Sequence, residues 1–142
     1  MKQINEEILD AWLELNHVID NEKIVSQLPY NEILIYRYLY QRQTQEVTAT
    51  QLCQAIGMLK SQMNRTLTAM EEKHLIHRIR STQDKRQIFV SINKEHMEVY
   101  ESEHTRILRI VDRLVERIGI EEAQNALSLF RQIAQIAKEE MK

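Results

Sequence analysis

The sequence predicts a mainly α-helical fold that contains one two-stranded β-hairpin. Apolar residues recur every three or four positions over most of the chain, which is the spacing of one face of a helix. The 142 residues include only 2 Gly and 1 Pro, too few for the many turns of an all-β fold. Two short strand-like runs, Ile76–Arg80 and Gln87–Ile92, flank a polar tip at Ser81–Arg86.

Two amphipathic helices are predicted at the start of the chain. The first runs from about residue 3 to 22, because apolar residues share one helical face at Ile4, Ile8, Trp12, Leu15 and Ile19. The second begins near Pro29, since proline suits the first turn of a helix, and continues to about Arg42. The segment Thr44–Val47 is predicted to be a loop.

The next two helices have the pattern of a helix-turn-helix. Thr48 is a suitable N-cap for a short helix over Ala49–Ile56, and Gly57 follows where helices end in the left-handed conformation. The second helix, about Lys60–Lys73, has an apolar face and an opposite face made of Ser61, Gln62, Asn64, Arg65 and Thr68. A tight glycine turn before a helix with a polar exposed face is typical of this motif.

Two long helices are predicted after the hairpin. Asn93 can cap a helix over Lys94–Ile118, Gly119 ends it, and the last helix covers about Glu121–Glu140. The last helix carries a second apolar stripe at Leu129, Ile133 and Ile136, and the first helix shows a weaker excess. A terminal helix of a small domain needs only one buried face, so both chain ends are predicted to form an isologous dimer interface. An unusually helical monomeric core is the alternative.

Positive charge is concentrated in the centre of the chain. The net charge is −2, yet residues 60–94 carry eight Lys/Arg and three acids, a balance of +5. Residues 1–28 and 95–142 are acidic, at −4 and −3. A basic hairpin directly after an amphipathic helix is how a winged helix reaches along a DNA backbone. The charge distribution therefore predicts one face that meets phosphate.

Other classes of protein are disfavoured. Cys53 is the single cysteine, which fits a reducing cytoplasm, and its apolar neighbours predict a buried thiol rather than a redox sensor. The acidic start of the chain does not resemble a signal peptide, and no apolar run approaches the ~20 residues of a membrane span. The sequence shows no Gly-rich phosphate loop, Ser/His/Asp arrangement or Cys/His cluster. We therefore expect neither an enzyme nor a metal or other cofactor.

The segment Leu75–Ile92, with Arg78, Ser81, Asp84 and Arg86 at its motif positions, resembles the wing of the MarR family of bacterial transcription regulators. Gln51–Met58 and Arg65–Lys73 are similar to that family's helix-turn-helix, and the order of elements is also similar. The resemblance implies one homodimeric winged helix-turn-helix domain over residues 1–142. Residues 28–93 would bind DNA, and residues 1–24 and 94–142 would form the dimerisation helices.

In the family, each recognition helix enters a major groove and each wing reaches a flanking minor groove. The resemblance implies that Asp84 pairs with a wing arginine and that Arg86 enters the minor groove. Independently, the polar side chains of the recognition helix suit base edges, and those near its N-terminus suit phosphate. The predicted DNA-binding residues are Lys60, Ser61, Gln62, Asn64, Arg65, Thr68, Arg78, Arg80, Asp84, Lys85 and Arg86. A solvated polar surface is the alternative for each.

Two positions depart from the family pattern. His74 stands where a glycine usually ends the recognition helix, although histidine tolerates the left-handed conformation better than most residues. Leu59 stands where Ser or Thr would cap that helix, so the cap is either lost or moved to Ser61.

The resemblance also implies an effector pocket between the second helix, the first helix and the long helix after the wing. Trp12, Tyr36 and Tyr40 are the candidate lining residues and suit a phenolic or other aromatic effector, with core packing as the alternative. The sequence thus predicts a homodimeric transcriptional regulator that binds a pseudo-palindromic operator and responds to a small molecule or stress. Repression is the predicted effect on transcription. The alternative is a winged-helix module that binds protein.

Overall fold

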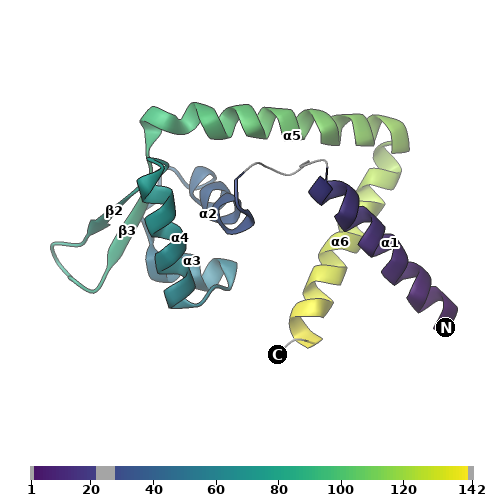
Figure 1. Cartoon of the computed structure of the whole chain (residues 1–142), viewed down its shortest axis with the longest axis horizontal. Coiled ribbons are helices and arrows are strands. Elements are labelled where there is room, and N and C mark those ends of the chain that lie inside the picture. The colour runs from purple at the N-terminus through teal and green to yellow at the C-terminus, as the bar shows by residue number, and fades with distance from the viewer. Residues whose placement is uncertain (1, 22–27, 141–142) are drawn as a thin grey trace. The chain divides into compact units, whose positions relative to one another are not determined.

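The structure, a computed structural model, describes residues 2–21 and 28–140 and is mainly helical, as predicted (Figure 1). The chain divides into two compact units, residues 1–103 and 104–142. The helices are α1 (Lys2–Asn21), α2 (Tyr30–Tyr40), α3 (Ala49–Ile56), α4 (Lys60–Glu72), α5 (Met97–Ile118) and α6 (Ile120–Glu140). None of the described helices is long and apolar enough to cross a membrane.

Helix α3 has the predicted boundaries, and the ends of α1, α2, α4 and α6 lie within two residues of the predicted ones. Pro29 is the N-cap of α2 rather than its first helical residue, and α2 ends at Tyr40, before Arg42. Residues 22–24, which belong to the predicted N-terminal dimerisation segment, lie outside the described residues, as do residues 141–142.

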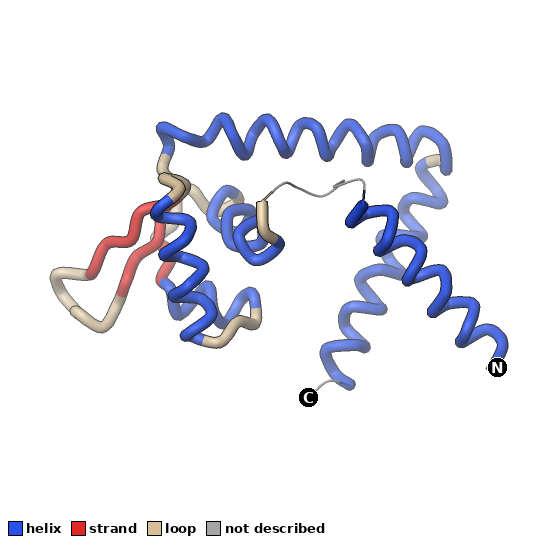
Figure 2. Tube along the Cα trace, viewed as in Figure 1, coloured by secondary structure: helices blue, strands red, loops and turns tan. Residues whose placement is uncertain are grey.

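The predicted two-stranded wing is confirmed, and it belongs to a sheet with a third strand, at Val47–Thr48, that was not predicted. The strands β1 (Val47–Thr48), β2 (Ile76–Arg80) and β3 (Ile88–Ile92) form an antiparallel sheet in the order β1-β3-β2 (Figure 2). Val47, predicted to lie in a loop, pairs with Val90 and is buried. A two-residue strand is too short to show alternation, and the burial of Val47 depends on a partner far along the chain.

The register of the hairpin explains why one face of β2 is apolar at the base and cationic toward the tip. Ile76 pairs with Ile92, Arg78 with Val90, and Arg80 with Ile88. Side chains two residues apart share a face of a strand, so Ile76, Arg78 and Arg80 lie on the same side of β2. At the base of the hairpin this face is buried in the core, and toward the tip it becomes cationic.

The recognition helix of the predicted helix-turn-helix is α4. A hydrophobic core that it shares with α2, α3 and the sheet holds it in place. Met63, Leu67 and Met70 of α4 are fully buried, as their spacing of four and three predicted. They pack with a cluster that contains Ile35, Tyr36, Leu39, Val47, Leu52, Met58, Leu75, Ile76, Val90, Ile92 and Tyr100. The core therefore attaches α4 to the base of the hairpin that follows it.

Asn93 caps the helical segment after the wing, as predicted, but that segment begins with one turn of 3₁₀-helix, Lys94–His96, before α5. Gly119, with φ +88°, separates α5 from α6 in the left-handed conformation. Apolar side chains remain largely exposed on α1, where they include Ile8, Trp12 and Leu13, and on α6, where they include Leu129, Phe130 and Ile133.

Candidate nucleic-acid interface

Local sequence chemistry builds the helix-turn-helix. Thr48 forms a capping box with Gln51: its Oγ1 accepts from the Gln51 backbone N–H at 3.1 Å, and the Gln51 side chain accepts from the Thr48 N–H at 3.4 Å. Gly57, with φ +82°, ends α3 and donates its N–H to the carbonyl of Cys53 at 2.9 Å. Leu59 is the N-cap of α4 and has no side-chain acceptor, so the usual cap is lost, as expected.

The outer face of α4 holds the predicted base-reading residues. Lys60, Ser61, Asn64, Arg65 and Thr68 are exposed on α4, and Gln62 is half-buried. Gln62 and Arg65 also line an open hollow between α4 and the start of α2. Ser61, Asn64, Arg65 and Thr68 therefore share the side of α4 away from its buried methionines and leucine. Lys60 lies at the start of the helix, in line with the buried Met63 and Leu67, and Gln62 lies toward α2.

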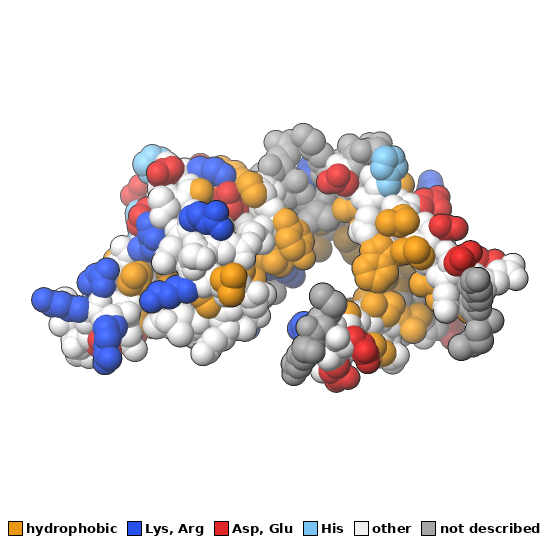
Figure 3. Space-filling view, turned by 60° about the horizontal axis from the view of Figure 1, so that its bottom comes forward, with side chains coloured by type: hydrophobic (Ala, Val, Ile, Leu, Met, Phe, Trp, Pro, Cys, Tyr) orange, Lys and Arg blue, Asp and Glu red, His pale blue; other side chains and the backbone are white. Residues whose placement is uncertain are grey.

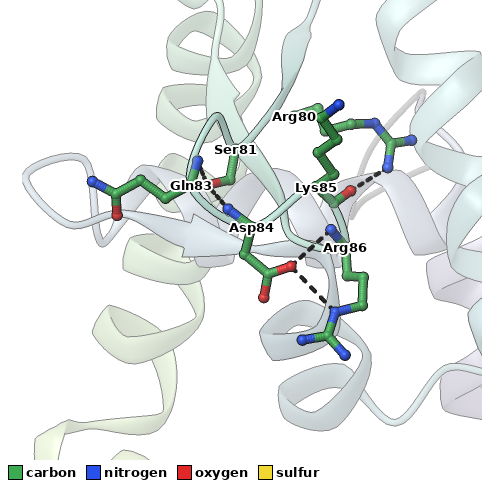
Figure 4. Close-up of polar contacts among 6 residues, drawn as sticks. All are labelled: Arg80, Ser81, Gln83, Asp84, Lys85 and Arg86. Carbon is green, nitrogen blue, oxygen red and sulfur yellow. Dashed lines mark hydrogen bonds and ion pairs between the residues drawn. The ribbon is translucent and has the colours of Figure 1, made fainter.

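Polar contacts preorganise the wing tip (Figure 4). One carboxylate oxygen of Asp84 accepts from the Arg86 backbone N–H at 3.0 Å and from Arg86 Nε at 3.2 Å. Ser81 Oγ accepts from the N–H groups of Gln83 and Asp84, both at 3.2 Å, and Arg80 donates to the Lys85 carbonyl. The arginine that pairs with Asp84 is thus Arg86 itself, and its side chain is still 92% exposed.

Arg78 points back toward the recognition helix. Its Nη2 donates to Glu71 Oε1 at 3.1 Å and to Thr68 Oγ1 at 3.0 Å, and its backbone N–H donates to Glu71 Oε2 at 3.0 Å. Hydrogen bonds from Arg78, together with its charge, lower the pKa of Glu71. Sequence reasoning grouped Arg78 with the other cations and missed Glu71. The signal was Thr68 and Glu71, three residues apart on one face of α4.

Lys and Arg side chains gather around the wing (Figure 3). Arg80, Lys85 and Arg86 of the hairpin, and Lys60 and Arg65 of α4, are all exposed. Such a concentration of cations attracts a polyanion through salt-dependent release of counterions.

The predicted effector residues are only partly brought together. Tyr36 is fully buried, and its ring centroid lies 4.5 Å from that of Tyr100, while the rings of Tyr40 and Tyr100 are 4.9 Å apart. Trp12 on α1 is 53% exposed and lies outside this tyrosine cluster. Sequence reasoning did not connect Tyr100, which lies on α5, with Tyr36.

The hydroxyl of Tyr36 has no hydrogen-bond partner among the described residues. Burial raises the pKa of Tyr36 to about 12, with smaller contributions from Glu101, Tyr100 and Tyr40. The tyrosine is therefore neutral at physiological pH and carries an unused donor and acceptor. Two surface hollows, one between α4 and the start of α2 and one between the end of α2 and β3, are lined by residues other than Tyr36 and Tyr40.

The histidines and the cysteine have structural surroundings. His74, with φ +62°, adopts the left-handed conformation in place of the usual glycine, and its ring meets that of His96 edge-on at 5.9 Å. Cys53 is half-buried and packs against the core. Within residues 2–21 and 28–140, no three His, Cys, Asp or Glu side chains converge as a metal site would require.

A helix-turn-helix followed by a two-stranded wing, with one basic face, defines a DNA-binding protein of the MarR type. Residues 16–102 match the family model described as transcriptional regulator SarA/Rot. The chain therefore belongs to the SarA/Rot family of transcriptional regulators. No curated protein matches the chain by sequence.

Solved structures of transcription regulators share the fold. The PcaV transcriptional regulator from Streptomyces coelicolor, in complex with its natural ligand, is 18% identical with a TM-score of 0.72, over 91% of each chain. YusO from Bacillus subtilis is 19% identical with a TM-score of 0.66, over 95% of this chain and 97% of its own. A mutant of MepR from S. aureus, bound to an oligodeoxyribonucleotide, is 18% identical with a TM-score of 0.62, over 91% and 97%.

Proposed function

We propose that this regulator binds a pseudo-palindromic DNA operator as a homodimer and represses transcription until a small molecule or stress signal releases it. The observation that carries the proposal is that the exposed polar face of α4 and the basic wing belong to the same compact unit. The polar face of α4 fits a major groove, and the exposed Arg86 at the wing tip fits the negative potential of a narrow minor groove.

The proposed contacts divide by chemistry. Gln62, Asn64 and Arg65 contact base edges, where each bidentate pair contributes about 1–3 kcal/mol of discrimination. Lys60, Ser61 and Thr68 on α4, with Arg80 and Lys85 on the wing, contact phosphate or position the groups that do. Asp84 holds Arg86 in place through the two hydrogen bonds at the tip.

Exposed apolar side chains on the terminal helices support the homodimer. On α6, Leu127, Leu129, Phe130, Ile133 and Ile136 are all exposed in the single chain, and Ile4, Ile8, Leu9, Trp12 and Leu13 are exposed on α1. Contiguous apolar surface of this kind is unfavourable in water and marks an interface. A two-fold dimer presents two recognition helices to half-sites about 34 Å apart, which matches a pseudo-palindrome.

A small aromatic or phenolic effector is the proposed signal, with Tyr36 and Tyr40 as its contacts. The unused hydroxyl of Tyr36 supplies a donor and acceptor for such a ligand. PcaV with its natural ligand and MepR with ethidium bromide show that proteins of this fold hold small molecules. The effector would act by changing the spacing of the two recognition helices, because simultaneous docking tolerates little change in that spacing.

Selection from a pool of randomised DNA duplexes tests the DNA-binding proposal. We expect enrichment of a pseudo-palindromic sequence. Fluorescence anisotropy at several salt concentrations should then show that Arg86→Ala weakens binding and lowers the salt slope by about one per protomer. Arg109→Ala, an exposed arginine of α5, is the matched control and should leave both unchanged. If no sequence is enriched and Arg86→Ala changes nothing, the protein-binding alternative is favoured.

Sedimentation equilibrium at micromolar concentration tests the homodimer. The parent chain should sediment as a dimer, and Ile133→Glu should shift it toward monomer because it places a charge in the apolar interface. A parent chain that sediments as a monomer would overturn the homodimer. Transcription in vitro from a promoter that carries the selected sequence then separates repression from activation.

A further inference from the structure

One ion pair joins the wing to the recognition helix near the base of the hairpin. Both carboxylate oxygens of Glu71 accept hydrogen bonds from Arg78 of β2. One oxygen accepts from Arg78 Nη2 at 3.1 Å, and the other accepts from the Arg78 backbone N–H at 3.0 Å. The same Nη2 also donates to Thr68 Oγ1 at 3.0 Å, one turn earlier on α4. The Arg78 side chain is only 22% exposed. The contact is therefore a three-residue clasp between α4 and β2.

We propose that Glu71 and Arg78 are positioning residues that fix the angle between the wing and the recognition helix. The protein would then present its major-groove and minor-groove contacts to DNA as one rigid unit. This inference rests on the proposed function of the same surface in DNA binding. It gives Arg78 a role other than the phosphate attraction expected from the sequence.

The geometry of the hairpin makes this angle important. The five residues of β2 extend about 16 Å, at about 3.3 Å per residue. A tilt of about 10° at the base would therefore move the tip by about 3 Å, a distance equal to the length of a hydrogen bond. Arg86 at the tip and Arg65 on α4 can reach their grooves together only if this tilt is restrained.

The charges of the pair argue against a simple phosphate contact. A phosphate would have to compete with the Glu71 carboxylate for the guanidinium of Arg78, and it would approach that carboxylate closely. The pair is neutral as a whole, so it adds nothing to the net positive charge of the face. A phosphate-binding arginine such as Arg86 is, by contrast, almost fully exposed.

Glu71→Gln gives opposite results under the two roles. Removing a negative charge beside DNA should tighten binding if electrostatics alone matters. If Glu71 positions the wing, affinity for the selected operator should instead fall about tenfold, a coupling typical of residues in one network. Affinity for an unrelated duplex and the salt slope should not fall. Glu72→Gln, the same change at the exposed neighbour, is the matched control.

Arg78→Lys keeps the charge but loses the longer, rigid guanidinium group whose Nη2 reaches both Glu71 and Thr68. The positioning role predicts a loss of operator affinity equal to that of Glu71→Gln, and no further loss in the double variant. The inference is overturned if Glu71→Gln binds the operator as well as the parent does. It is also overturned if Arg78→Lys is harmless while Arg78→Ala lowers the salt slope by about one, which would identify a phosphate contact.

A measurement without DNA separates this inference from the proposed function. Spin labels at Gln83→Cys on the wing tip and Gln54→Cys on α3, in a Cys53→Ser background, report the distance from wing to helices. Glu71→Gln should broaden that distance distribution, and Glu72→Gln should not. An unchanged distribution would overturn the positioning role even if the protein binds DNA. A chain that fails to select an operator but shows the broadening would overturn only the proposed function.

Discussion

Asn93 Nδ2 donates a hydrogen bond of 2.9 Å to the backbone carbonyl of His74, which joins the end of the recognition helix to the start of the helical segment that leads into α5. Asn93 is buried, and its backbone N–H also donates to the Leu75 carbonyl at 2.9 Å. Its Oδ1 accepts from the Glu95 N–H at 3.2 Å. One side chain thus serves as a helix cap and as a brace for the left-handed turn at His74.

Asn93→Ala should lower the free energy of unfolding by about 2 kcal/mol, because it removes a helix cap and leaves a carbonyl without its donor. Urea denaturation followed by circular dichroism measures the change. Asn93→Asp keeps the cap but loses the donor, so it should fall between the parent and Asn93→Ala. Ser91→Ala, at an exposed position of β3, is the control. A loss below about 0.5 kcal/mol for Asn93→Ala, the range of ordinary surface changes, would contradict this role.

Lys73→Ala should destabilise the protein because it leaves the carboxylate of Glu32 buried without its cation. Lys73 Nζ donates to both oxygens of Glu32 at 2.9 Å and ties the recognition helix to α2. Glu32 is 4% exposed, whereas the Lys73 side chain is 44% exposed. Because solvent reaches the lysine, we expect a loss of about 1–2 kcal/mol rather than the larger cost of breaking a fully buried pair.

A double-mutant cycle in urea checks the Lys73–Glu32 pair. Glu32→Gln in the Lys73→Ala background should recover part of the lost stability, since the unpaired charge is then gone. Lys94→Ala, an exposed lysine just after the sheet, should be neutral. Additive single changes would show that the pair does not couple the two helices.

Tyr36→Phe should raise the free energy of unfolding by about 1 kcal/mol, because it removes a buried hydroxyl that has no partner among the described residues. The pH dependence gives a second signature. The folded pKa of Tyr36 is about 12, above the unfolded value of about 10. The unfolded chain therefore loses this proton first. The associated stability is complete below pH 10 and is lost as pH rises from 10 to 12.

Urea denaturation of Tyr36→Phe at pH 8 to 12 should show a smaller alkaline loss than in the parent. Tyr30→Phe is the control, because Tyr30 is 69% exposed and its hydroxyl meets water in both states. An equal alkaline loss in Tyr36→Phe and the parent would assign the effect to other groups. Reduced release from DNA by a phenolic effector in Tyr36→Phe would in turn support the proposed effector contact.

Local chemistry made much of the fold predictable. The capping box at Thr48, the left-handed Gly57 and the spacing of Met63, Leu67 and Met70 depend only on neighbours within one or two helical turns. The wing tip belongs to the same class, because Asp84 and Arg86 are two residues apart. Such features follow from backbone geometry and residue type before any tertiary contact is known.

The features that sequence reasoning missed depend on register between distant segments. Strand β1 exists because Val47 meets Val90 across the sheet. The Glu32–Lys73 pair spans 41 residues. Glu71 and Arg78 are only seven residues apart, but their contact requires the turn at His74 to fold β2 back along α4. A count of charges carries no information about such a turn. Sequence reasoning therefore treated Arg78 as one cation among several.

Asp84→Ala should weaken operator binding even though it removes a negative charge from the proposed DNA-binding surface. Asp84 accepts two hydrogen bonds from Arg86, at 3.0 Å and 3.2 Å, and without them the arginine must be ordered on binding. We expect about a fivefold to tenfold loss of affinity, in line with the cost of immobilising one long side chain. Asp84→Asn keeps an acceptor for the Arg86 N–H and should lose less. Anisotropy titration at fixed salt measures both variants, with Asp112→Asn on α5 as the charge-matched control. Tighter binding by Asp84→Ala would show that the carboxylate only repels phosphate and does not hold Arg86 for the groove.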